Sequence, residues 1–247
     1  MILVNNVLIK LVEASLCEEQ IWKDDETLNN GFYIKMKNKN LFVTIEGGEG
    51  SGKTTQSILL KEHLEHKGYT VVLTREPGGT VFAESIRNII LNPKSNLTSE
   101  AELFLYEAAR AQHVQEIVIQ NLKKGAVVIC DRFTDATVAY QGYARKLDIS
   151  LINKLNNIAS LGIKPIVTIY LDINPFKGLN KAKDLDKEFY GIKGDRIERE
   201  SLEFHKNVRK GYLEQAKKYP NRIKVVKTQS SPEKTHKLIK QIIDTVL

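Results

Sequence analysis

The sequence predicts an α/β fold, a three-layer sandwich in which a parallel sheet of five strands lies between two layers of helices. Two observations predict it. Short β-prone runs alternate with longer helical patterns from residue 41 to the end of the chain, and this alternation is typical of βα units whose strands pair in parallel. Apart from Thr168, the runs at 126–130 and 165–171 are apolar throughout, as in strands that helices cover on both faces.

The first expected strand, 41–46, ends at two glycines. A helical stretch over 53–66 follows, and Gly68 ends it. A second strand is expected over 70–75, and the Pro-Gly-Gly sequence at 77–79 breaks it, because proline and glycine interrupt regular structure.

Two helices are expected next, over 81–91 and 98–123. The Leu-Thr-Ser-Glu sequence that opens the second is a helix start signal, and Gly125 ends that helix. The two apolar runs and a run at 222–226 supply the remaining strands, and an amphipathic helix from Ser231 completes the chain.

Composition narrows the class of protein. The chain has 247 residues, of which 42% are hydrophobic and 27% charged, and this suits one soluble domain. No apolar run approaches the ~20 residues of a membrane span, and the acidic residues near the N-terminus do not suit a signal or transit peptide. Cys17 and Cys130 suggest no disulfide framework. We therefore expect a cytoplasmic protein without membrane contact.

The net charge of +7 is unevenly distributed. The first 35 residues hold three lysines against six acidic residues, whereas the rest holds 34 basic against 24 acidic residues, a net +10. Such a basic body can attract nucleic acid or a small polyanion. More often, however, an excess of lysine reflects only a solvated surface without a partner. Arginines cluster around the motifs below, which favours small phosphates, and we expect no nucleic-acid partner.

Two regions are expected along the chain. Residues 1–38 form an acidic extension that includes a second plausible start at Met36. We interpret this extension as flexible or as the product of a start codon set too early, with an ordered regulatory arm as the alternative. Residues 39–247 contain every motif described below and are expected to fold by themselves.

A phosphate-binding loop follows the first strand. Its glycines let backbone N–H groups turn inward to phosphate oxygens, and the helix that follows presents its positive end to the same anion. Lys53 is expected to reach the β- and γ-phosphates, and Thr54 and Asp131 to hold Mg²⁺. The pattern and its strand-to-helix context predict a P-loop NTPase that binds ATP through Gly47, Gly48, Glu49, Gly50, Ser51, Gly52, Lys53 and Thr54.

Three arginines mark an acceptor site. Arg75 ends the second strand, Arg132 follows the third, and Arg110 lies four residues after Tyr106, on the same helix face. A guanidinium fork suits phosphate, and an aromatic ring can stack on a base. Each arginine alone could form a surface salt bridge, but their joint position beside a phosphate loop favours a phosphorylated acceptor.

Several blocks of sequence occur in order along the chain. They are Glu49 in the loop, Thr-Arg-Glu-Pro-Gly-Gly-Thr (74–80), Ala-Ala-Arg-Ala-Gln-His (108–113), Asp-Arg-Phe (131–133), Ala-Tyr-Gln-Gly (139–142) and Asp-Arg-Ile-Glu (195–198). In these blocks the chain resembles bacterial thymidylate kinases over about residues 41–247. The resemblance implies transfer of a phosphoryl group from ATP to dTMP, with Mg²⁺, by a homodimer on an adenylate-kinase-like sheet with a short lid, as a step of dTTP synthesis.

The resemblance also implies roles around the acceptor sugar and phosphate. Glu49 would contact the 3′-hydroxyl of dTMP, and Arg75 and Arg132 would bind its phosphate. Tyr140 would press on the sugar where a ribonucleotide carries its 2′-hydroxyl.

Four more residues are implied around the base. Tyr106, where many relatives have phenylalanine, would stack on thymine, and Arg110 would donate to a thymine carbonyl. Thr137 would lie near the N3 edge, and Gln141 would line the same pocket.

The catalytic cations are the part of the chain that departs most from the resembled family. We expect Lys53 and Arg132 to act in catalysis, together with a cation from the lid at about 177–194. Family members carry an arginine in the phosphate loop or in the lid, and neither holds one here. The lid cation is left open among Lys181, Lys183, Lys187, Lys193 and Arg196.

Three other classes of protein share a phosphate loop of this kind. A deoxynucleoside kinase or another nucleotide kinase would share the phosphate loop, but the first needs a base for a neutral hydroxyl and does not need arginines for an acceptor phosphate. A nucleic-acid-stimulated P-loop ATPase would use the basic body. A GTPase is disfavoured because Asn180-Lys181-Ala182-Lys183 has lysine where the guanine-reading motif needs aspartate.

Overall fold

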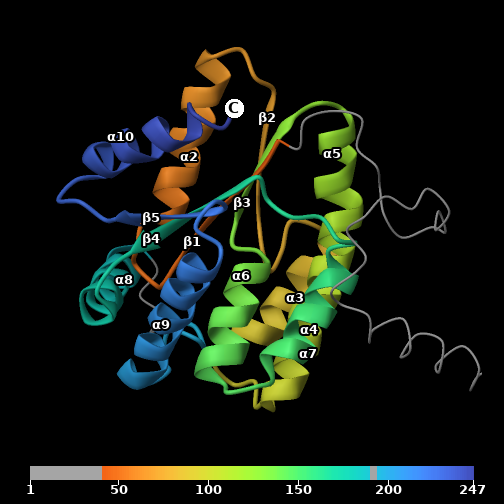
Figure 1. The fold of residues 1–247 in the computed structure, drawn as a ribbon. Helices are drawn as coiled ribbons and strands as arrows, with labels where there is room; N and C mark the ends of the chain where they lie inside the picture. The colour runs from red at the N-terminus through yellow and green to blue at the C-terminus, as the bar shows by residue number, and fades with distance from the viewer. Residues whose placement is uncertain (1–40, 190–193) are drawn as a thin grey trace, which may run out of the picture. The chain divides into compact units, whose positions relative to one another are not determined.

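The computed structural model describes residues 41–189 and 194–247, and the predicted extension, 1–38, lies outside the described residues. Five parallel strands form one sheet in the order β2-β3-β1-β4-β5 (Figure 1). The predicted five-stranded parallel sheet is therefore confirmed. The strands are β1 (Phe42–Gly47), β2 (Val71–Arg75), β3 (Val127–Asp131), β4 (Val167–Asp172) and β5 (Ile223–Lys227).

Helices connect and flank the strands. Helices α2 and α3 begin and end where the sequence predicts, whereas the predicted helix over 98–123 consists of α4, a π-helical turn η1, and α5. The helices are α2 (Lys53–His66), α3 (Val81–Leu91), α4 (Ser99–His113), η1 (Val114–Val118), α5 (Ile119–Lys123), α6 (Thr134–Thr137), the π-helical η2 (Val138–Ala144), α7 (Ile149–Ala159), α8 (Pro175–Phe189), α9 (Leu202–Lys218) and α10 (Pro232–Ile243).

Successive side chains of a strand point to opposite faces of the sheet, and helices cover both of these faces. Val43 and Ile45 of β1 pack with α2 and α10, whereas Phe42 packs with η1 and α5. Figure 1 shows α2 and α10 together on one face of the sheet. The three-layer sandwich is therefore confirmed.

The strand order places the site. β1 pairs with β3 on one side and with β4 on the other. The chain crosses from β1 to β2 toward one edge of the sheet and from β3 to β4 toward the other edge, so the connections that follow the neighbouring strands β1 and β3 run in opposite directions. Ligands of open α/β sheets bind at such a point. The phosphate loop follows β1 there, and Arg132 follows β3. Within the described ranges, no helix is long and apolar enough to cross a membrane.

Candidate active site

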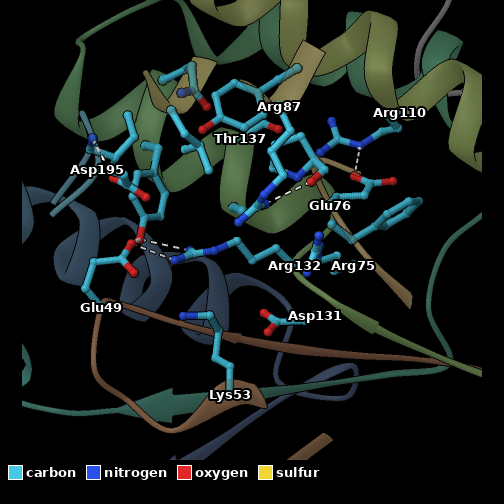
Figure 2. A pocket seen from close by; sticks show the side chains of 18 of the residues that line it. Glu49, Lys53, Arg75, Glu76, Arg87, Arg110, Asp131, Arg132, Thr137 and Asp195 are labelled. Carbon is cyan, nitrogen blue, oxygen red and sulfur yellow. Dashed lines mark hydrogen bonds and ion pairs between the residues drawn. The ribbon is translucent and has the colours of Figure 1, made fainter. Parts of the chain in front are cut away.

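A cavity of about 230 Å³ opens at the carboxyl ends of the strands. Figure 2 shows Lys53 and Asp131 at one end of it and Arg110 and Thr137 toward the other. The predicted site residues that line it are Glu49, Lys53, Thr54, Arg75, Tyr106, Arg110, Asp131, Arg132, Thr137, Tyr140 and Gln141.

The phosphate loop has the expected backbone. Gly50 and Gly52 adopt φ of 64° and 90°, conformations that glycine takes at little cost. Gly52 precedes α2 with no side-chain cap, so the first N–H groups of α2 are available to an anion. The buried Lys53 donates from Nζ to the carbonyl of Gly48 at 3.1 Å. Burial and Arg132 lower the pKa of Lys53, while Glu49 opposes them.

Oxygen atoms converge beside the loop. The Thr54 hydroxyl donates to Asp131 Oδ2 at 3.2 Å, although the two residues are 77 positions apart in sequence. A hydroxyl and a carboxylate are hard oxygen ligands, and Mg²⁺ takes one or two of these and completes its shell with waters and phosphates. The donor set therefore fits the predicted metal.

Glu49, Arg132 and Tyr140 form a cluster between the loop and the acceptor side. Arg132 Nη2 donates to Glu49 Oε1 at 2.7 Å, and its Nη1 to the hydroxyl of Tyr140 at 2.9 Å. The Tyr140 hydroxyl in turn donates to Glu49 Oε1 at 2.9 Å. Burial acts to raise the pKa of Glu49, but Arg132 and Lys53 lower it to about 2. Glu49 therefore stays anionic.

The sequence interpretation missed Arg87. Its guanidinium lines the cavity beside Arg75 and donates from Nη1 to the carbonyl of Pro77 at 2.9 Å. Burial and the charge of Arg75 lower the pKa of Arg87. Arg75, Arg87 and Arg132 thus line the same cavity, and their three positive charges favour the binding of an anion. The signal was available: Arg87 interrupts the apolar pattern of α3, directly after the segment that carries Arg75.

The far end of the cavity is polar and buried. Arg110 donates from Nε to Glu76 at 2.8 Å and from Nη1 to Glu107 at 3.0 Å and to Asn156 at 2.6 Å. The buried Thr137 Oγ1 has no hydrogen-bond partner among the described residues. This orphan hydroxyl and the fixed guanidinium offer polar contacts to a ligand.

Tyr106 and Phe104 point differently, as their spacing on α4 predicts. Tyr106 lines the cavity, whereas Phe104 is 57% exposed. The hydroxyl of Tyr106 accepts and donates no hydrogen bond within the described ranges, which leaves it free for a ligand.

Helix α8, which contains most of the predicted lid, meets the phosphate loop. A Cβ on Gly50 would clash with the carbonyl of Gly178, and a Cβ on Gly178 would clash with the carbonyl of Glu49. Lys181, on the same helix, is exposed. The side chains of Lys183 and Lys187, and the whole of Lys193, lie outside the described residues.

Arg196 is placed differently from the sequence expectation. It does not line the cavity. Its Nε donates to the carbonyl of Ile90 at 2.7 Å and its Nη2 to Glu102 at 2.5 Å. The protein thus holds one edge of the Arg196 guanidinium, and its role as the lid cation stays a prediction.

Glu46, at the end of β1, is a buried carboxyl that the sequence interpretation did not single out. It accepts hydrogen bonds from the backbone N–H of Phe133 and from the Tyr212 hydroxyl, both at 2.7 Å. The first bond fixes the turn in which Arg132 adopts a φ of 70°, uncommon for a residue other than glycine. Burial and the charge of Asp135 raise the pKa of Glu46 from 4.5 to about 8.

This pKa makes stability depend on pH. The folded chain holds the Glu46 proton up to about pH 8 and the unfolded chain only to about 4.5. The wild type should therefore lose stability relative to Glu46→Gln as pH rises between these values, by up to about 1.4 kcal/mol per pH unit. Urea unfolding of both proteins at several pH values measures the difference, and parallel stability curves would contradict the prediction.

Comparisons with known proteins give the family. A family model described as thymidylate kinase matches residues 45–239. A thymidylate kinase of Citrifermentans bemidjiense is 47% identical over 203 residues, which are 82% of this chain and 90% of that protein. One of Gloeobacter violaceus is 45% identical over 207 residues, 84% of this chain and 96% of that protein. A crystal structure of thymidylate kinase from Ehrlichia chaffeensis covers 82% of this chain and 97% of its own, with a TM-score of 0.66 and 36% identity. The chain, with its phosphate loop and its arginine-lined cavity, therefore belongs to the thymidylate kinase family.

Proposed function

We propose that this chain transfers the γ-phosphoryl group of ATP to dTMP, giving ADP and dTDP, as a step of dTTP synthesis. One observation carries the proposal: a single cavity joins the phosphate loop to a set of arginines and then to a buried polar end. A donor triphosphate suits the first part, an acceptor phosphate the second and a base the third. The family membership supports the same reaction.

The reaction needs positioning and charge stabilisation more than covalent chemistry. Lys53 and the N-terminus of α2 hold the donor phosphates, and Arg75, Arg87 and Arg132 align the acceptor phosphate. Since that phosphate is already an anion, no general base is required. Mg²⁺, held by Thr54 and Asp131, would neutralise charge on the donor phosphates.

The sugar of dTMP would lie against Glu49 and Tyr140. Glu49 is anionic, so it can accept a hydrogen bond from the 3′-hydroxyl. The ring of Tyr140 is fixed by Arg132, whose guanidinium lies 4.9 Å from its centroid. A ring held in this way cannot move aside for a 2′-hydroxyl, which favours deoxyribonucleotides.

The base would bind at the buried end. Tyr106 would stack on thymine, and Arg110, Thr137 and Gln141 would meet its polar edge. For the lid cation we propose a lysine of the predicted lid. Among the candidates, Lys181 on α8 has a side chain that the structure describes. Lysine supplies charge without the bidentate fork of arginine.

A panel of acceptors tests the proposed function. With ATP and Mg²⁺, release of ADP should be fast with dTMP and much slower with dUMP, UMP, dCMP and thymidine. Preference for thymidine would indicate a deoxynucleoside kinase. ATP hydrolysis stimulated by DNA but not by dTMP would overturn the proposal in favour of a nucleic-acid motor.

We also propose that the enzyme is a cytoplasmic homodimer. Four large apolar side chains lie exposed on the neighbouring helices α3 and α4, more than a solvated face of one monomer needs. They are Val81, Phe82, Ile89 and Phe104, exposed at 89%, 52%, 48% and 57%.

Phe104→Glu should convert the dimer to a monomer, because a carboxylate at the centre of an apolar interface loses its hydration. Light scattering after size-exclusion chromatography measures the mass. The matched control is Ile58→Glu, which changes an exposed apolar residue on α2 and should leave the mass unchanged. Wild-type protein that already elutes as a monomer contradicts the proposal.

A further inference from the structure

A buried carboxylate contacts Gln141, at the end of the cavity where the base is proposed to bind. Glu102, on α4, is 1% exposed and does not itself line the cavity. It accepts a hydrogen bond from Gln141 Nε2 at 2.7 Å. It also pairs with Arg145 at 3.0 Å and with Arg196 at 2.5 Å. Glu102 thus connects α4, the π-helical segment η2 and the Asp-Arg-Ile-Glu segment.

The charge of Glu102 decides how Gln141 is oriented. Burial acts to raise the pKa of Glu102, but Arg145 and Gln141 lower it, so the carboxyl is ionised. An ionised carboxylate can only accept hydrogen bonds. Gln141 must therefore turn its NH₂ group toward Glu102, because its carbonyl oxygen, the other end of the amide, has no proton to donate.

The carbonyl oxygen of Gln141 is left for the ligand. Gln141 is 1% exposed and lines the cavity, and its Oε1 accepts no hydrogen bond from any described residue. A buried acceptor of this kind needs a donor, because leaving it unpaired is costly. Any base that binds here must supply an N–H at this position.

Pyrimidines differ at that position. Thymine carries a donor at N3 between two carbonyl acceptors, whereas cytosine carries an acceptor at N3 beside an amino donor. An acceptor from Gln141 and a donor from Arg110 match thymine. With cytosine, the acceptor of Gln141 would face the acceptor N3, and the donor of Arg110 would face the amino donor.

We propose that Glu102 is a positioning residue for base specificity: it holds the amide of Gln141 so that an acceptor faces the base, and the site thereby favours pyrimidines with an N3–H. The inference rests on the proposed function and deepens it. It assigns a role in base specificity to Glu102, which does not itself line the cavity.

The test is the ratio of kcat/KM for dTMP to that for dCMP. In Glu102→Gln the neutral amide can offer either a donor or an acceptor, so Gln141 is free to turn over. The ratio should fall about tenfold or more, the size expected for one misplaced buried hydrogen bond. An Arg145→Gln control breaks another contact of Glu102 but keeps Gln141 in place, so it should leave the ratio unchanged even if it lowers stability.

A double-variant cycle separates positioning from folding. Gln141→Leu should also lower the ratio, and adding Glu102→Gln to it should lower the ratio no further. An unchanged ratio in Glu102→Gln, with stability lowered as in Arg145→Gln, overturns the inference. If Glu102→Gln does not fold, Gln141→Leu provides the test. An unchanged ratio of kcat/KM for dTMP to that for dCMP in Gln141→Leu also overturns the inference. A wild type that ignores dTMP would refute the proposed function instead.

Discussion

Lys53→Ala should lower kcat by about 10²-fold or more, as expected when one preorganised donor to the transition state is lost. The Lys53 Nζ donates to the carbonyl of Gly48 in the phosphate loop, and Asp131 and Glu49 support its charge. Alanine removes that charge from the space where the migrating phosphoryl group gains negative charge. Steady-state rates at saturating ATP and dTMP measure the loss.

The control is Lys61→Ala. Lys61 lies on the same helix, and its side chain is 40% exposed, so removing it should leave kcat unchanged. Thermal unfolding of both variants checks that α2 remains formed. Near-normal turnover of Lys53→Ala would remove Lys53 from the catalytic set.

Arg132→Ala should lower kcat/KM for dTMP by about 10³-fold, within the range measured when one partner of a buried, hydrogen-bonded charge pair is truncated. Two losses combine. The acceptor phosphate loses a guanidinium, and Glu49 loses its partner at 2.7 Å. Arg132→Lys should recover part of the activity, because lysine restores the charge without the fork that reaches Glu49 and Tyr140 together.

The double variant Arg132→Ala with Glu49→Gln separates folding from function. Arg132→Ala alone removes the guanidinium that pairs with the buried Glu49 carboxylate, which costs stability, and the neutral glutamine lowers that cost. The melting temperature should therefore recover in the double variant while kcat/KM stays low. If kcat/KM recovers together with the melting temperature, Arg132 acts through stability and not through the acceptor phosphate.

The strands and the phosphate loop could be predicted because their signals are local. The apolar runs at 126–130 and 165–171 and the glycines of the loop each impose their structure within a few residues. The sequence analysis did not predict helices α6 to α9, although Asp148 and Ser201 cap the starts of α7 and α9. The Ala-Tyr-Gln-Gly block is predicted as part of a site, and it lies in the π-helical segment η2, which no local propensity marks.

The fold class, the phosphate loop and most side chains of the acceptor side could be predicted from the chain, because glycine spacing, strand ends and motif blocks are properties of the sequence. The tertiary structure alone decided the partners. It paired Arg196 with Glu102, brought Arg87 beside Arg75 and turned the amide of Gln141 toward a carboxylate 39 positions away in sequence. Hydrogen bonds and ion pairs depend on distances of a few ångströms between elements remote in the chain, and only packing sets those distances.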